Sequence, residues 1–223
     1  MKKIIASFAL PVLFLFTSSH SFASTALIDM ATTNTSTTTL WPWSSSGSYS
    51  YGNVISPASD MNVGSFSFQM KKDTSNDSVA QPFNAYIYES NSSGVLSGSA
   101  IAQSNETIST NSTSLTEVKA ELTSTVTLSS GSYYTLIFNV VGVSGADSSD
   151  KYRWLFSNVA DSQAAGIWYS NDSSDGISNP YHSSFSNFAL KVYEVETQTQ
   201  TCAGTGPNCK DLTYWESIEY FGL

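Results

Sequence analysis

The chain has 223 residues, with 18 acidic and 9 basic side chains and a formal net charge of −9 at pH 7. Charged residues make up 12% of the sequence, about half the share that is usual in soluble domains. So acidic a chain lacks the groups of Lys and Arg that neutralise phosphates, which argues against binding to nucleic acid or to an anionic membrane. Aromatic residues make up 13%, enough for a packed core rather than a disordered chain.

The first 23 residues have the form of a bacterial secretory signal peptide. Lys2 and Lys3 precede an apolar run over residues 4–16, and the small residues Ser21 and Ala23 mark a cleavage site. The apolar run is too short to cross about 30 Å of hydrocarbon, so we expect cleavage rather than membrane anchoring. The sequence therefore predicts a secreted protein, in the periplasm or outside the cell, with no membrane span.

The segment that follows, residues 24–39, consists mostly of small and polar residues. Such a composition buries too little apolar surface to order itself, which predicts a flexible Ser/Thr-rich lead-in. An edge segment of the fold is the alternative. We place the folded domain at residues 40–197 and a C-terminal appendage at residues 198–223.

Short strand-like segments, separated by Ser, Gly, Asn and Asp, fill the predicted domain. In one of them Phe66, Phe68 and Met70 alternate with polar residues, which is the period of a strand with one buried face. About nine short strands without a helix predict an all-β fold, an antiparallel β-sandwich of jelly-roll-like form. The expected strands are residues 48–55, 62–71, 83–89, 100–108, 115–128, 133–143, 152–158, 166–170 and 185–195.

Several strand and turn segments occur in an order that resembles a known family. They are Tyr51-Gly52 with Ile55, Val63-Gly64-Ser65-Phe66-Ser67-Phe68, Phe83-Asn84-Ala85-Tyr86-Ile87-Tyr88, Leu96-Ser97-Gly98, Leu128-Ser129-Ser130-Gly131-Ser132-Tyr133-Tyr134 and Phe188-Ala189-Leu190-Lys191. Over about residues 48–195 the chain resembles the bacterial exported choice-of-anchor domains of the R type. The resemblance implies a β-sandwich module at or outside the cell surface, usually tethered by a separate C-terminal sorting signal. The sequence shows no such signal, so we expect free secretion.

Four aromatic residues are the candidate ligand-binding residues: Tyr86, Tyr88, Trp154 and Trp168. Strand alternation places Tyr86 and Tyr88 on the face opposite the apolar residues that flank them. Aromatic rings on a non-core face stack on sugar rings, which favours carbohydrate as the ligand class. Packing against other parts of the sandwich is the alternative.

The sequence predicts no catalytic residue. His182 is the only histidine after the signal peptide, and no Gly-x-Ser-x-Gly motif presents a nucleophile. Glu117 and Glu121 share one face of a strand, a pattern typical of a solvated face rather than of paired catalytic carboxylates. The alternative is a small secreted polysaccharide hydrolase or lyase that uses His182 with Tyr181 and Arg153.

Residues 171–176, Asn-Asp-Ser-Ser-Asp-Gly, loosely resemble the start of a calcium loop. The twelfth position of such a loop is His182 instead of a bidentate glutamate. We therefore interpret the segment as a hairpin turn and expect no metal or cofactor, with a structural calcium ion as the alternative.

The C-terminal appendage contains both cysteines of the chain, Cys202 and Cys209. In an exported protein such a pair predicts a disulfide, here closing a short Gly/Pro loop. The aromatic tail beyond it, residues 212–223, either caps the sandwich or docks to a protein partner. The favoured function is a secreted or cell-surface, non-catalytic binding or matrix module, and a structural surface component that assembles through this tail is a further alternative.

The disulfide gives a direct test. We expect mature protein, alkylated without prior reduction, to carry no label on Cys202 or Cys209 in mass spectrometry. The bond should stabilise its local loop by about 2–3 kcal/mol. Two labelled cysteines would contradict the prediction.

Overall fold

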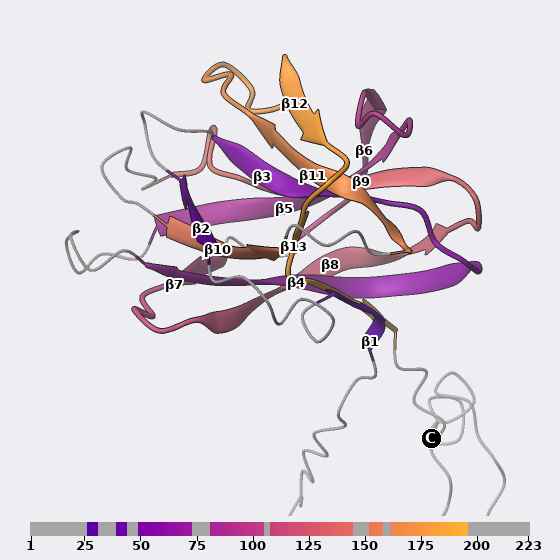
Figure 1. Cartoon of the computed structure of the whole chain (residues 1–223), viewed down its shortest axis with the longest axis horizontal. Helices are drawn as coiled ribbons and strands as arrows, with labels where there is room; N and C mark the ends of the chain where they lie inside the picture. The colour runs from indigo at the N-terminus through magenta and orange to yellow at the C-terminus, as the bar shows by residue number, and fades with distance from the viewer. Residues whose placement is uncertain are drawn as a thin grey trace, which may run out of the picture.

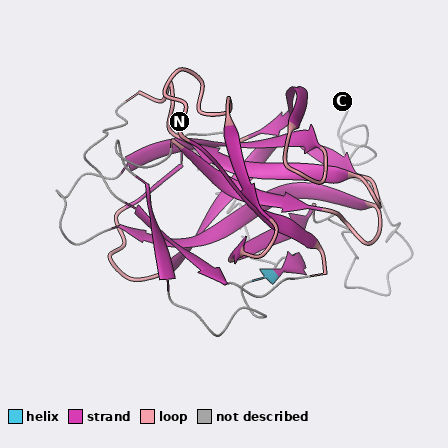
Figure 2. Ribbon diagram, turned by 45° about the horizontal axis from the view of Figure 1, so that its top comes forward, coloured by secondary structure: helices cyan, strands magenta, loops and turns pink. Residues whose placement is uncertain are grey.

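The computed structural model describes residues 26–30, 39–43, 49–72, 81–104, 108–144, 152–157 and 162–195. These segments form two antiparallel sheets that pack face to face (Figures 1 and 2), which confirms the predicted all-β sandwich. Within the described part of the chain, no helix is both long and apolar enough to span a membrane. The signal peptide and the C-terminal appendage, with Cys202 and Cys209, lie outside the described residues.

The first sheet is organised around its longest inner strand, β4. This strand pairs with β8 along one side, and with β14 and then β10 along the other. Strand β1 extends the sheet beyond β14, and β2 extends it beyond β10. The strands of the first sheet are β1 (Ala26–Asp29), β2 (Thr39–Trp43), β4 (Met61–Lys72), β8 (Thr116–Leu128), β10 (Tyr152–Ser157), β13 (Asn187–Phe188) and β14 (Leu190–Glu194).

The second sheet lies above the first in Figure 1 and has the order β12-β11-β3-β9-β5-β6, with β7 also paired to β5. Its strands are β3 (Ser50–Ile55), β5 (Gln81–Ser90), β6 (Leu96–Gln103), β7 (Ile108–Thr110), β9 (Tyr133–Asn139), β11 (Ala164–Ser170) and β12 (Pro180–Ser183). The chain crosses between sheets from β3 to β4, from β4 to β5 and from β8 to β9. As a result β9 lies between β3 and β5, the interleaving expected of a jelly-roll-like sandwich.

Aromatic rings from both sheets meet at the centre of the sandwich. The ring of Phe138 in β9 lies 5.0 Å from that of Phe68 in β4 and 4.6 Å from that of Phe83 in β5, centroid to centroid. Trp154 in β10 packs 4.9 Å from Phe68, and all four side chains are fully buried. Each such pair stabilises the fold by about 0.5–1.5 kcal/mol beyond the area it buries. The alternation seen in the sequence therefore supplies a largely aromatic core.

One buried polar side chain joins the two sheets. Asn53, on the inner face of β3, donates its amide N–H to the carbonyl oxygen of Phe188 at 2.9 Å. Its amide oxygen accepts the backbone N–H of the same residue at 3.0 Å. Phe188 ends β13, and the next residue, Ala189, bonds to β10 through its N–H and to β4 through its carbonyl. The Asn53 amide thus replaces a strand partner at the point where the last strand passes from β10 to β4.

The first strand corrects the prediction of a flexible lead-in. Residues Ala26–Asp29 pair with β14 as an edge strand, and Ile28 and Met30 are buried in the core. The alternative interpretation of this segment, an edge segment, is the one observed for these residues. The sandwich therefore begins by residue 26 rather than at residue 40.

Other strand boundaries differ from the predicted ones where residues far apart in the sequence decide the pairing. Residues 180–183, which lie between two of the expected strands, form β12 because β11 offers them a partner. The expected strand 100–108 is split between β6 and β7, and the expected strand 185–195 is interrupted at Ala189.

We expect Asn53→Ala to lower the free energy of unfolding by about 3 kcal/mol. The substitution leaves the buried N–H and C=O of Phe188 without their partner, at a cost of about 1–3 kcal/mol for each group. Urea denaturation followed by Trp fluorescence measures the change. The control is Asn62→Ala, which removes the same amide from an exposed position on β4. Equal losses in both variants would contradict the bridging role of Asn53.

Candidate functional site

Trp154, one of the four predicted ligand-binding residues, lies in the core between the two sheets. Its side chain has 0% exposure and packs against Phe68, Phe138 and Phe188. A ligand at the surface does not reach this ring. The prediction of Trp154 as a binding residue is therefore corrected: its strand turns this side chain inward.

Trp168, Tyr88 and Tyr86 do share the outer face of the second sheet, but most of this face is covered. The indole N–H of Trp168 donates to the carbonyl oxygen of Gly94, at 2.9 Å, in the turn between β5 and β6. A Cβ on Gly94, whose φ is +72°, would stand 2.7 Å from the Trp168 ring, so the turn lies directly over the indole.

The turn therefore leaves little of the predicted ligand-binding rings exposed. Trp168 has 0% exposure and Tyr88 7%, and burial raises the pKa of Tyr88. Only Tyr86 is half-buried, with its ring 6.1 Å from that of Tyr88. The four residues therefore do not form one exposed surface, and Trp168 and Tyr88 act mainly as packing.

A partly exposed aromatic pair lies instead at the edge of the second sheet. Tyr181 in β12 is directly opposite Tyr169 in β11, with ring centroids 4.7 Å apart and planes inclined by 31°. Tyr181 is 51% exposed. The row continues inward, because Tyr169 lies 5.9 Å from Tyr51, and Tyr51 lies 5.6 Å from Trp154. We call Tyr51, Tyr169 and Tyr181 the tyrosine ladder.

The ladder was missed in the sequence because its outer ring depends on a pairing between distant strands. In the sequence, Tyr181 stands out only as a partner of His182 in the enzyme alternative, and no strand is predicted there. The alternation in residues 167–170 was the available signal for the ladder, because it places Tyr169 and Trp168 on opposite faces of the strand.

The three residues of the enzyme hypothesis do not converge. Tyr181 and His182 are neighbours in β12 and so point to opposite faces of the sheet. His182 Nε2 lies 2.9 Å from the carbonyl oxygen of Ala165. Arg153 belongs to β10 in the other sheet and points away from the core, since the adjacent Trp154 points inward. The geometry brings no acid, base and cation together at these positions.

The acidic residues of the loop 171–176 accept hydrogen bonds from groups within the same turn. Asp172 Oδ1 accepts the backbone N–H of Ser174 at 2.8 Å, and Asp175 Oδ1 accepts those of Ile177 and Ser178 at 2.8 and 2.9 Å. Hydrogen bonds from Ser174 lower the pKa of Asp172, and the two backbone donors lower that of Asp175. Among the described residues, no three His, Cys, Asp or Glu side chains gather in a way that holds a metal ion.

The outer face of the first sheet carries a polar network centred on Glu117 of β8. Its carboxylate accepts hydrogen bonds from the hydroxyl of Ser67, at 3.0 Å, and from the hydroxyl of Tyr193. Lys191 Nζ lies 3.2 Å from Glu117 and 3.9 Å from Asp29. The network thus connects β8, β4, β14 and β1. Glu117 was expected on a solvated face, and the structure shows it on that face but hydrogen-bonded to its neighbours.

These contacts shift two pKa values in opposite directions. Burial, together with the hydrogen bond to the Glu117 carboxylate, raises the pKa of Tyr193 to about 12. Burial also raises the pKa of Glu117, but the hydrogen bonds from Tyr193, Lys191 and Ser67 outweigh it and leave the pKa below its ordinary value. The network therefore favours a protonated Tyr193 and an ionised Glu117.

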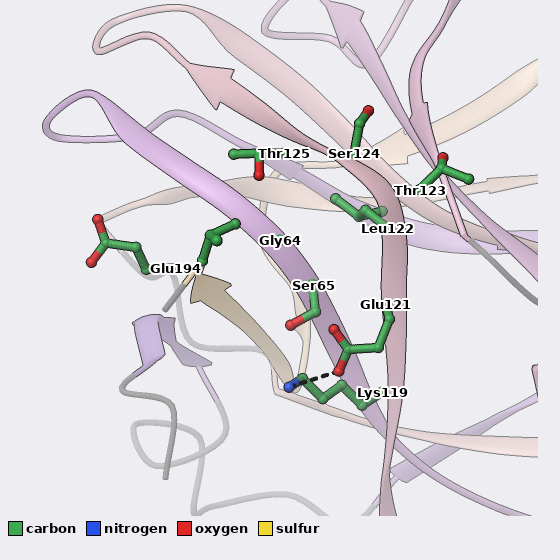
Figure 3. Close-up of a pocket in the computed structure, with 10 residues that line it drawn as sticks. Gly64, Ser65, Lys119, Glu121, Leu122, Thr123, Ser124, Thr125 and Glu194 are labelled. Atoms are coloured by element: carbon green, nitrogen blue, oxygen red, sulfur yellow. Dashed lines mark ion pairs between the residues drawn. The ribbon is translucent and has the colours of Figure 1, made fainter. Parts of the chain in front are cut away.

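A pocket lies next to this network, where β8 departs from β4. The pairing of the two strands shifts register between Val63–Val126 and Ser65–Glu121, so that residues 122–125 bulge away from β4. The resulting hollow, about 450 Å³, is the bulge pocket (Figure 3). It is lined by Gly64, Ser65, Lys119, Glu121, Leu122, Thr123, Ser124, Thr125, Glu194 and Val195.

Comparison with known proteins adds no relative: no protein-family model, curated protein or solved structure matches the chain. The resemblance to choice-of-anchor domains therefore stays a prediction. Within the described part of the chain, the outer end of the tyrosine ladder and the bulge pocket are two candidate binding surfaces.

The Glu117 network predicts a pH dependence of stability. Glu117 has a lowered pKa when folded, so its contribution is present above the unfolded value, about 4.3, and is lost as the pH falls through the folded value. Tyr193 has a raised pKa, so its contribution is present below about 10 and is lost as the pH rises towards 12.

We therefore expect Glu117→Gln to flatten the acid limb and Tyr193→Phe the alkaline limb of the stability curve, measured by urea denaturation from pH 3 to 11.5. Glu121→Gln, at an exposed position of the same strand, is the control. A control curve that flattens as much as that of Glu117→Gln would count against the network.

Proposed function

We propose that this chain is a secreted or cell-surface, non-catalytic binding or matrix module whose ligand is a carbohydrate. The observation that carries the proposal is the half-exposed ring of Tyr181, held against Tyr169 at the edge of the second sheet. The predicted signal peptide supports secretion.

The tyrosine ladder suits a sugar because it offers a rigid aromatic surface. A pyranose ring presents apolar C–H groups on its faces, and an aromatic ring contacts them over a large area while its hydroxyl hydrogen-bonds to the sugar. Each ring of the ladder is backed by the next, as far as the buried Trp154. Little side-chain entropy is therefore lost when a ligand binds, which favours affinity.

The negative net charge of the chain favours neutral over anionic carbohydrates as ligands. With twice as many acidic as basic residues, 18 against 9, the protein repels polyanions at neutral pH. Neutral glycans fit this surface better than uronic-acid or sulfated polymers.

The enzyme alternative draws no support from the arrangement of His182, Tyr181 and Arg153, which lie on different faces and sheets. Assembly through the aromatic tail concerns residues outside the described part of the chain. Glycan binding at Tyr181 is thus the hypothesis that the described residues favour.

We expect Tyr181→Ala to weaken glycan binding several-fold to about tenfold, since a stacked aromatic ring contributes about 0.5–1.5 kcal/mol beyond its area. A glycan array with the mature protein identifies the ligand, and calorimetry then compares the variants. The melting temperature should change little, because the ring is half exposed.

Phe185→Ala is the matched control. Phe185 is 78% exposed but belongs to the connection after β12 rather than to the ladder. We expect this variant to bind as the unsubstituted protein does. An array without a bound glycan, or equal weakening by both substitutions, would overturn the proposal.

A further inference from the structure

We propose that the bulge pocket is a second ligand site, which takes a single uncharged sugar unit independently of the tyrosine ladder. The pocket lies on the outer face of the first sheet, between β4, β8 and the end of β14 (Figure 3). The tyrosine ladder ends at β12, an edge strand of the second sheet. The inference thus goes beyond the proposed function and rests on different residues.

The pocket is built by the fold rather than left by chance packing. Leu122 is 6% exposed and forms an isolated bridge with Ser104, which follows β6 in the second sheet. The hydroxyl of the next residue, Thr123, donates to the carbonyl oxygen of Gln103 at 2.9 Å. Strand β8 is therefore drawn towards the second sheet at this point, and the gap to β4 opens on the outer face. Bulges of this kind occur often beside functional sites, because they redirect side chains.

Gly64 leaves room for the side chain of Val195 beside β4. A Cβ at this position would stand 2.6 Å from Cγ2 of Val195, far inside a normal contact distance. With glycine, Val195 lies close against β4, and the wall of the pocket at this point is backbone without a side chain. The volume of about 450 Å³ lies within the range of small-molecule sites.

Hydrogen-bonding groups dominate the lining. Ser65, Ser124 and Thr125 contribute hydroxyls, each of which can donate one hydrogen bond and accept others. The hydroxyl of Thr123 already donates to Gln103. Carboxylates that accept hydrogen bonds come from both sides, from β8 and from β14. Only Leu122 and Val195 contribute aliphatic side chains. Such a lining matches a small molecule with many hydroxyl groups and one limited apolar face, which describes a sugar unit.

The charges of the pocket argue against an anionic ligand. The single ammonium group of the lining, on Lys119, is 2.9 Å from a carboxylate oxygen of Glu121 and 4.8 Å from the centre of the Tyr193 ring. Its positive charge is thus already balanced, and Glu194 adds a further negative charge. A uronate, phosphate or sulfate therefore meets net repulsion, whereas an uncharged hexose does not.

The test is an NMR titration of the mature, isotopically labelled protein with glucose, galactose and mannose, with glucuronate as the charged counterpart. We expect saturable shifts at residues 119–125 and 194–195 with at least one neutral hexose, at millimolar concentration. Glucuronate should bind at least threefold more weakly. These shifts should persist in Tyr181→Ala, because the tyrosine ladder is a separate site. The two proposals can therefore fail independently: the shifts test the bulge pocket, and the glycan affinity of Tyr181→Ala tests the ladder.

Two substitutions of the same kind on β8 provide the sharpest comparison. Thr125→Val removes a hydroxyl from the pocket and should weaken hexose binding threefold to tenfold, as expected for one lost hydrogen bond. Thr127→Val removes a hydroxyl from the same strand outside the pocket, where it donates to Asn62, and should leave binding unchanged. Ser124→Trp fills the pocket and should abolish binding. If this last variant does not show a normal thermal transition, the two threonine variants decide.

Three results would overturn the proposal. They are the absence of saturable shifts at residues 119–125 with all three hexoses, equal weakening by Thr125→Val and Thr127→Val, and glucuronate binding as tight as that of the best hexose.

Discussion

The hydrogen bonds between Asn53 and Phe188 hold the arrangement of the two sheets. Their distances are 2.9 and 3.0 Å, and both residues are fully buried. An unpaired backbone group in such a place is costly, so the Asn53 amide permits the last strand to leave β10 and join β4 inside the core. The same amide nitrogen lies 3.4 Å from the sulfur of Met30, which follows β1. The residue after β1 and the last residue of β13 therefore meet at one side chain.

The crossing at Phe188 also lies behind the tyrosine ladder at the edge of the second sheet. The Phe188 ring packs 5.8 Å from Tyr51 and 5.3 Å from Trp154, both in the core. Tyr51 in turn supports Tyr169 and, through it, Tyr181. Exposure rises along this row from 0% at Trp154 to 51% at Tyr181. Packed rings therefore support the exposed ring of Tyr181 from behind.

The outer face of the first sheet shows how polar side chains serve two purposes on one strand. Glu117 is bound by Ser67, Tyr193 and Lys191, and holds neighbouring strands together. Glu121, further along β8, is more exposed and borders the bulge pocket. Lys119 lies between them, paired to Glu121 and placed over the Tyr193 ring. A stabilising network and a proposed binding surface thus share a strand, separated by the beginning of the bulge.

The sequence by itself determined the fold class and which side chains share a face. The alternation of side chains is a property of each extended backbone, so Phe66 and Phe68 were predicted to be buried, and Tyr86 and Tyr88 to face the other way. Only the tertiary structure decided which of these faces is covered. The turn at Gly94 buries Trp168, strand pairing turns residues 26–29 and 180–183 into β1 and β12, and the pull of β6 on β8 opens the bulge pocket. These outcomes depend on contacts between residues far apart in the chain, which a local pattern does not contain.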